Sequence, residues 1–203
     1  MAERSGRWLI AIMGAVLMLC LGTVYAWSFF QDLLVRQYHD LYGWSNSQVA
    51  WVFSLAIFFL GVTAAWGGTQ LPKTGPRRMA MPGGLLFAAG YLIAGFALQI
   101  RSLPLLYIGY GALGGIGFGL GYVTPVATVS KWFPDRKGLA TETVIMGFSL
   151  GAVFFVFTVG PAAFMRNPEK GWLLSFIIGA CFLAVGFILS LFMSGKPFES
   201  KAA

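Results

Sequence analysis

The segment Leu105–Val129 reads LLYIGYGALGGIGFGLGYVTPVATV and contains no charged side chain. A helix needs about 20 predominantly apolar residues to cross the hydrocarbon core of a bilayer, and this segment is long enough. Similar apolar runs occur along the whole chain, separated by short polar stretches: Trp8–Phe30, Val49–Gly67, Met79–Ile100, Leu105–Val129, Leu139–Met165 and Trp172–Met193. These runs predict an all-α membrane protein with a single six-helix transmembrane domain over residues 1–203.

The composition supports a lipid environment. Of the 203 residues, 58% are hydrophobic and only 10% are charged, whereas soluble domains carry about 25% charged side chains. The mean hydropathy is +0.76, so a soluble fold would leave large apolar patches facing water. The first apolar run follows Arg4 and Arg7 as in a secretory signal. It exceeds the roughly 7–15-residue apolar core of a cleaved signal, and we expect it to stay as the first helix.

The formal net charge of +7 is interpreted as a topology signal and not as a sign of nucleic-acid binding. Lysine and arginine in short loops tend to remain in the cytoplasm. With the N-terminus inside, the inner segments hold Arg4, Arg7, Lys73, Arg77, Arg78, Lys131, Arg136, Lys137, Lys196 and Lys201, and the outer segments hold Arg36, Arg101, Arg166 and Lys170. We therefore expect a multi-pass protein of the cell (inner) membrane with both termini in the cytoplasm. Its first partner is the lipid bilayer.

Glycines recur at helical spacing in two of the apolar runs. Gly111, Gly115 and Gly119 follow one another every four residues, and Gly147 and Gly151 repeat this spacing. Stripes of small residues let helix backbones approach closely in a membrane, where the hydrophobic effect does not pull helices together. We predict that these glycines pack against neighbouring helices.

Two short motifs match enzyme patterns, but their context excludes an enzyme. Gly109–Gly114 fits G-x-G-x-x-G, which binds dinucleotides only after a strand. Gly147–Gly151 fits G-x-S-x-G, which needs a strand-to-helix turn. Both lie within long apolar runs, and Cys20 and Cys181 have no metal-ligand spacing. We therefore predict no enzymatic activity, no catalytic residue, no metal site and no cofactor.

Glu142 is the one ionisable residue close to hydrocarbon, near the start of the fifth run. Ionisable groups within a membrane often mark ion or proton pathways, so Glu142 could have a coupling role. Alternatively, it pairs with Arg136 or Lys137, or lies at the level of the lipid headgroups. The other spans lack acidic groups, which argues against a proton relay through their middle.

The connection between the second and third runs reads GTQLPKTGPRR from Gly68 to Arg78. It resembles the major facilitator superfamily loop G-x-x-x-D-R/K-x-G-x-R/K-R/K. The resemblance implies a conformational or gating loop whose matching residues are Gly68, Lys73, Gly75, Arg77 and Arg78. Glycines permit a tight turn there, and the cations can contact helix C-termini and acidic partners. Pro72 stands where the family has aspartate.

Three further stretches resemble the oxalate:formate antiporter family within that superfamily. They read LGTVYAWS at Leu21–Ser28, GLGYVTPVAT at Gly119–Thr128 and KWFPDRKGLA at Lys131–Ala140. The family includes relatives assigned to lactate and other small carboxylates. The chain departs from the family pattern at Glu142, where glycine is expected, and at Val24, where the oxalate carrier has glutamine.

The resemblance implies that the chain is one half of a major facilitator fold, with three helices related to three others by inversion. It also implies that Tyr25, Tyr122 and Trp27 bind substrate in a midplane cavity. Phenol hydroxyls can donate to a carboxylate while the rings pack around a small organic anion. As an alternative, each aromatic side chain faces lipid or packs in the core.

We accordingly predict half of a secondary transporter for small carboxylates, either oxalate and formate or a lactate-like monocarboxylate. Transport would proceed by antiport or proton symport. In the family, the cations that bind substrate belong to the other half, so the chain would need a second six-helix half or a second copy of itself. The alternative is a non-transporting accessory or remnant membrane protein that assembles through its glycine-rich helix faces.

Overall fold

The computed structural model describes residues 2–159, 175–181, 184–185 and 188, which contain helices and no strand. The elements over 2–159 are α1 (Ala2–Leu21), η1 (Gly22–Ala26), α2 (Trp27–Tyr42), α3 (Asn46–Thr74), α4 (Pro76–Gln99), α5 (Leu103–Leu106), η2 (Tyr107–Gly114), α6 (Gly115–Trp132), α7 (Lys137–Phe154) and η3 (Phe155–Val159). The segment η1 is a 3-10 helix, and η2 and η3 are π-helices.

Five helices in the described part are long and apolar enough to cross a membrane: Arg7–Arg36, Asn46–Thr74, Pro76–Gln99, Leu103–Trp132 and Lys137–Phe157. They coincide closely with the first four apolar runs and with the first part of the run Leu139–Met165. The end of that run and most of Trp172–Met193 lie outside the described residues. The sixth helix and the inverted repeat therefore remain predictions.

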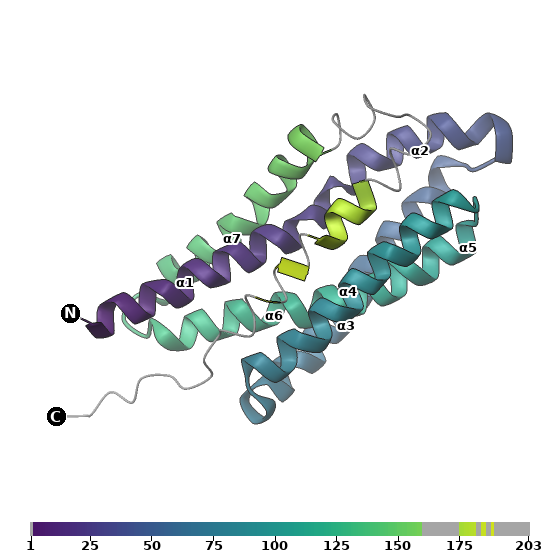
Figure 1. Cartoon of the computed structure of the whole chain (residues 1–203). Coiled ribbons are helices and arrows are strands. Elements are labelled where there is room, and N and C mark those ends of the chain that lie inside the picture. The colour runs from purple at the N-terminus through teal and green to yellow at the C-terminus, as the bar shows by residue number, and fades with distance from the viewer. Residues whose placement is uncertain (1, 160–174, 182–183, 186–187, 189–203) are drawn as a thin grey trace.

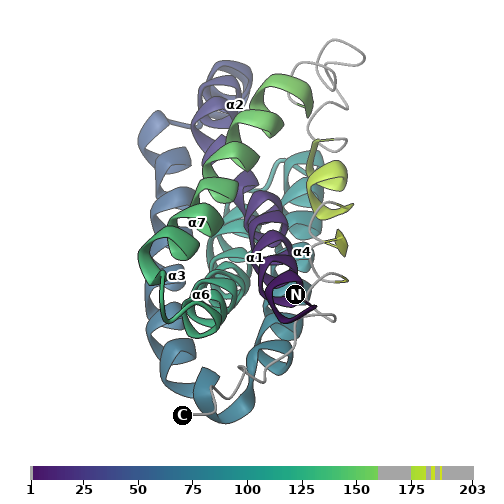
Figure 2. The ribbon, with the colours of Figure 1, turned by 90° about the vertical axis from the view of Figure 1, so that its left-hand side faces the viewer.

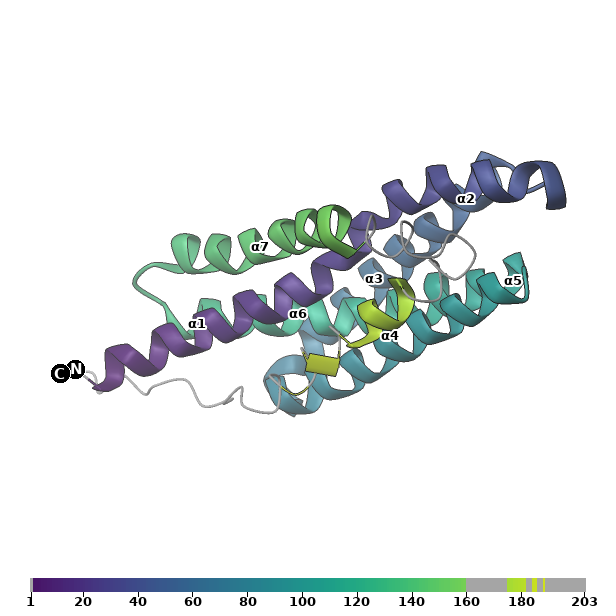
Figure 3. The ribbon, with the colours of Figure 1, turned by 45° about the horizontal axis from the view of Figure 1, so that its top comes forward.

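The helices form a bundle in which α6 takes a central place. It packs against α3 and α4, and α7 packs along α1. Figure 2 views the bundle nearly end-on and shows α6 among α1, α3 and α4. Figure 3 shows α1 and α2 continuing in almost one line through η1, with α7 beside α1. The first span is therefore one long helix interrupted by a short 3-10 segment.

Glycines lie where helix backbones come closest. A Cβ atom on Gly115 would stand 2.6 Å from the carbonyl oxygen of Ala56, so α6 lies directly on α3. A Cβ atom on Gly151 would be closer still to the carbonyl oxygen of Leu19 in α1. Gly111 and Gly119 extend the first contact, and Gly147 extends the second. These backbones can touch because glycine has no side chain to hold them apart.

The link between α3 and α4 is shorter than the sequence indicates. The predicted connection covers 68–78, but α3 continues to Thr74 and α4 begins at Pro76, so only Gly75 lies outside a helix. Gly75 has φ of 82°, in the region that glycine occupies readily and other residues do not. A single residue therefore reverses the chain. Pro76 suits the first position of α4. A backbone N–H at that position has no partner within the helix, so proline, which has no N–H, loses no hydrogen bond there.

The described basic side chains gather at the two ends of the bundle. At one end, Arg7 of α1 forms an ion pair with Asp135 at an N–O distance of 3.7 Å. At the other end, the Arg101 guanidinium donates to the Tyr42 hydroxyl and lies 5.0 Å from the centre of its ring. The first end holds Arg7, Lys73, Arg77, Arg78, Lys131, Arg136 and Lys137, and the second holds Arg36 and Arg101.

Single cysteines should reveal which of these ends faces the cytoplasm. After replacement of Cys20 and Cys181 by alanine, we expect Thr74→Cys and Asp135→Cys to react only with a reagent that crosses the membrane. His39→Cys, at the opposite end, should react with an impermeant maleimide applied to intact cells. All three positions are exposed, so burial does not protect them. The reverse labelling pattern would contradict the orientation deduced from charge.

The close helix contacts predict a contrast between two glycine-to-alanine changes. Gly115→Ala should destabilise the protein by about 1–3 kcal/mol, the usual cost of forcing extra volume into a packed site. Gly61→Ala in α3 is the matched control, since a Cβ atom there meets nothing within 4 Å. Alanine is also the better helix former, by about 0.8–1 kcal/mol. Thermal unfolding in detergent should show a lower midpoint for Gly115→Ala only. Equal midpoints would be evidence against backbone contact at Gly115.

Candidate functional site

The first span changes from α-helix to 3-10 helix at η1, between Gly22 and Ala26. The Trp27 N–H donates to the carbonyl of Val24, three residues earlier, which is the spacing of a 3-10 helix. Gly22 allows this segment to press against α7, because a Cβ atom there would overlap the carbonyl oxygen of Phe148. Tyr25 belongs to η1, so the break determines where this side chain lies.

Tyr25 lies on an open surface of the bundle with 51% of its side chain exposed. Its ring makes edge-to-face contacts with Phe148 of α7 at 5.1 Å between centroids and with Phe53 of α3 at 6.1 Å. Such contacts are worth about 0.5–1.5 kcal/mol beyond the buried area. The ring is held from two sides, and the side chain remains accessible.

Tyr122 of α6 is half-buried and contacts the same phenylalanine. Its ring centroid lies 5.9 Å from that of Phe148 and 6.2 Å from that of Phe118. Tyr25 and Tyr122, far apart in the sequence, thus both contact one ring. We call the cluster of Tyr25, Phe53, Tyr122 and Phe148 the aromatic face. Tyr25 is exposed, Phe53 and Tyr122 are half-buried, and Phe148 is buried. The aromatic face combines two phenol groups, which can donate hydrogen bonds to an anion, with apolar rings that can pack around carbon atoms.

Trp27 does not belong to the aromatic face. It is 2% exposed, its ring lies 4.5 Å from that of Tyr110, and its Nε1 has no hydrogen-bond partner in the described part of the chain. Two residues along a helix separate it from Tyr25, and such neighbours point in different directions. The alternative of core packing therefore describes Trp27 better than substrate contact.

The residues of the gating-loop motif lie at the end of the bundle that carries most cations. Gly68 and Lys73 are exposed in α3, Arg77 and Arg78 are exposed in the first turn of α4, and Gly75 joins the two helices. A cavity beside this junction is lined by Gly75 and Pro72 on one side and by Lys131 and Trp132 of α6 on the other. The motif thus meets the end of the central helix α6.

Other residues considered in the sequence take surface positions. Glu142 is exposed on α7 and forms no ion pair with Arg136 or Lys137 in the described part of the chain. Ser149 is exposed within the uninterrupted helix α7, and Gly109–Gly114 lies within η2. Neither enzyme-like motif has the strand that its chemistry requires. Among the described residues, no group of three His, Cys, Asp or Glu side chains could hold a metal ion.

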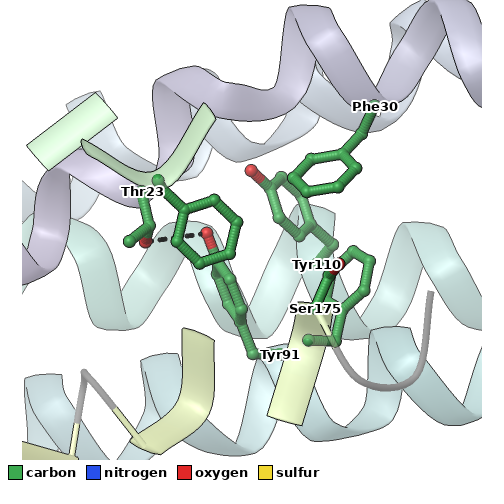
Figure 4. Close-up of a pocket in the computed structure, with 7 residues that line it drawn as sticks. Thr23, Phe30, Tyr91, Tyr110 and Ser175 are labelled. Atoms are coloured by element: carbon green, nitrogen blue, oxygen red, sulfur yellow. Dashed lines mark hydrogen bonds between the residues drawn. The ribbon is translucent and has the colours of Figure 1, made fainter. Parts of the chain in front are cut away.

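The structure also brings together buried hydroxyl groups that the sequence did not single out. Thr23 of η1 and Tyr91 of α4 are joined by a hydrogen bond of 3.1 Å, and the Tyr110 hydroxyl donates to the Val24 carbonyl at 3.1 Å. Figure 4 shows Thr23, Tyr91, Tyr110 and Ser175 around one small cavity. These contacts hold η1 from its buried side, opposite to the exposed Tyr25.

The sequence model of the Major Facilitator Superfamily matches residues 8–203. The chain belongs to this superfamily. Membership confirms the resemblance found in the sequence, and it identifies a multi-pass membrane protein of a transporter family and not an enzyme. The five membrane-length helices of the described part agree with this assignment.

Several individual transporters are similar to the chain in sequence. The uncharacterized MFS-type transporter YhjX of Escherichia coli (strain K12) is 31% identical over 74% of this chain and 36% of its own length. The oxalate:formate antiporter of Oxalobacter formigenes is 29% identical over 92% of this chain and 41% of its own length. Monocarboxylate transporter 7 of Homo sapiens is 28% identical over 71% of this chain and 25% of its own length. The chain thus spans less than half the length of each of these relatives.

Proposed function

We propose that the chain forms one half of a secondary transporter for small carboxylates, working by antiport or proton symport. The observation that carries this proposal is the aromatic face, where Tyr25 and Tyr122 both contact Phe148. Two neutral donors beside apolar rings suit an anion that has a carboxylate and a short carbon skeleton. The names of two relatives, an oxalate:formate antiporter and a monocarboxylate transporter, support the same substrate class.

The site proposed here needs a second half, because the aromatic face supplies no positive charge. Every described lysine and arginine lies toward one of the two ends of the bundle. A neutral hydrogen-bond donor contributes about 1.5–3 kcal/mol to a charged group, so two tyrosines supply roughly 3–6 kcal/mol. Lost freedom alone costs about 4–15 kcal/mol on association. A second copy of this chain would bring the same neutral groups, so a half with an intramembrane cation fits better.

In the complete transporter, this chain would contribute a 3+3 inverted repeat, with substrate held near the midplane against the other half. The motif residues Gly68, Lys73, Gly75, Arg77 and Arg78 would lie at the cytoplasmic end of an inner-membrane protein. Pro72 removes the family's aspartate from this motif, so any ion pair made here must use another carboxylate. The rest of the motif can still couple α3 and α4 to α6 during rocking.

The alternative is a membrane accessory or remnant protein that assembles with others through its glycine faces. Its support is weaker because those faces are already used within the chain. Gly111, Gly115 and Gly119 lie against α3, and Gly147 and Gly151 lie against α1. A protein that assembled through them would first have to separate its own helices. The aromatic face, whose Tyr25 is exposed, is the better candidate for contact with a second half.

Uptake in reconstituted vesicles tests the transport proposal. We expect this chain and a second six-helix half with an intramembrane lysine or arginine to exchange labelled oxalate, formate or lactate, and neither half to do so alone. Tyr25→Phe and Tyr122→Phe should each lower uptake about 10-fold or more, since losing one hydrogen bond to a charged group is worth about 1.5–3 kcal/mol. Each change keeps the ring, so assembly should persist.

Ser149→Ala is the matched control for these two variants. Ser149 is exposed on α7 next to Phe148, and its replacement also removes one hydroxyl group. It should leave uptake unchanged, and esterase activity should be undetectable with or without Ser149. If both tyrosine variants transported at the normal rate, the aromatic face would not be the binding site.

Calorimetry on the isolated chain tests the need for a partner. We expect no micromolar binding of oxalate, formate or lactate, because two neutral donors cannot offset the desolvation of the anion. Titration of the assembled pair should give measurable heat that disappears in Tyr25→Phe. Micromolar binding to this chain alone would show that the site is complete within its 203 residues.

A further inference from the structure

A small cavity lies on the buried side of η1, away from the aromatic face. It is lined by Thr23, Phe30, Tyr91, Tyr110, Phe155, Ser175 and Phe176 (Figure 4). The cavity volume is about 10 Å³, which is close to the minimum that a single water molecule requires. The hydroxyl groups of Thr23, Tyr91, Tyr110 and Ser175 therefore share a cavity of one-water size within the bundle.

The protons of three of these hydroxyls can be assigned from their partners. Thr23 donates to the carbonyl of Cys20 at 3.2 Å, so its hydrogen bond with Tyr91 uses the Tyr91 proton. Tyr110 donates its proton to the carbonyl of Val24. Each phenol has thus spent its donor. The two phenol hydroxyls also interact with each other, and the lone pairs of the two oxygens leave room to accept a further hydrogen bond.

Ser175 completes the pattern from another helical segment. It is fully buried at 0% exposure, and its Oγ has no hydrogen-bond partner among the residues that the structure describes. A buried hydroxyl without a partner costs about 1–3 kcal/mol. The cavity wall therefore presents two oxygen atoms that can accept and one hydroxyl group that can donate. A water molecule has two donors and can accept from a hydroxyl, so its hydrogen-bonding capacity matches this wall.

We propose that the cavity is a binding site for one structural water molecule, which donates to the oxygens of Tyr91 and Tyr110 and accepts from Ser175 Oγ. Buried waters typically make about three hydrogen bonds to polar groups of this kind. The water links the segment that contains Ser175 to the two tyrosines that hold Thr23 and Val24. It thereby braces the buried side of η1, the segment that carries Tyr25. This site is separate from the proposed carboxylate site.

Radiolytic footprinting of the whole chain in lipid nanodiscs tests the proposal directly. A short X-ray pulse converts bound water into hydroxyl radicals, which oxidise the rings beside it. We expect Tyr91 and Tyr110 to be oxidised severalfold faster than Phe87 and Phe118, after each rate is divided by the intrinsic reactivity of its residue type towards hydroxyl radicals. The two phenylalanines are an appropriate reference because both are 1% exposed and neither lines the cavity. Equal rates for the two pairs in the unmodified chain would overturn the proposal.

A substitution at Ser175 gives a second readout. Ser175→Val removes the hydroxyl group and fills the cavity, so oxidation of Tyr91 and Tyr110 should fall to the level of Phe87. Ser149→Val is the matched control, since it makes the same change at an exposed site and should leave these rates unaltered. If oxidation of the tyrosines persisted in a folded Ser175→Val protein, radicals from another source would be responsible and the water site would be refuted. The unmodified chain decides the question if Ser175→Val does not fold.

Discussion

The fold depends on contact between helix backbones within lipid. In hydrocarbon every backbone N–H and C=O must bond within the protein, so spans are helical, and burial from water cannot drive helices together. Association then requires close van der Waals contact, which in this chain occurs where glycines meet backbone carbonyls. Gly115 lies on Ala56, and Gly151 lies on Leu19. These two contacts fix α6 against α3 and α7 against α1, and the aromatic face is assembled from α3, α6, α7 and η1, which continues α1.

The segment η1 has a distinct role on each of its sides. Its outer side presents Tyr25 beside Phe148, and its inner side is held through Val24 by Tyr110 and through Thr23 by Tyr91. A 3-10 segment in a long helix has poorer hydrogen-bond geometry than the α-helix around it. Side-chain hydroxyls from two other helices reinforce it from within. The position of Tyr25, which is carried on an irregular backbone, is in this way fixed from the buried side.

Much of this arrangement could be predicted from the sequence, and the rest could not, for physical reasons. Apolar runs reveal the helices, because lipid requires every span to be helical. The charge bias of the loops predicts their orientation. Tyr25 and Tyr122 were found through resemblance to a family. The pairing of Thr23 with Tyr91 spans 68 positions, and no local pattern encodes it. Trp27 lies apart from Tyr25 because residues close in a motif need not share a helix face. The apolar run ends at Gly67 while α3 continues to Thr74, because hydropathy marks the part of a helix within hydrocarbon and not the turns beyond it.

The single-residue link at Gly75 has a consequence for how the protein is made. A long loop between two spans would let the first helix settle in the bilayer before the second emerges. One residue between α3 and α4 leaves no slack, so once α3 spans the bilayer the start of α4 is held at the surface where α3 ends. The two helices are therefore placed as one hairpin. Lys73, Arg77 and Arg78 surround its tip, and their charges keep that tip at a membrane surface, because charged side chains are costly within hydrocarbon.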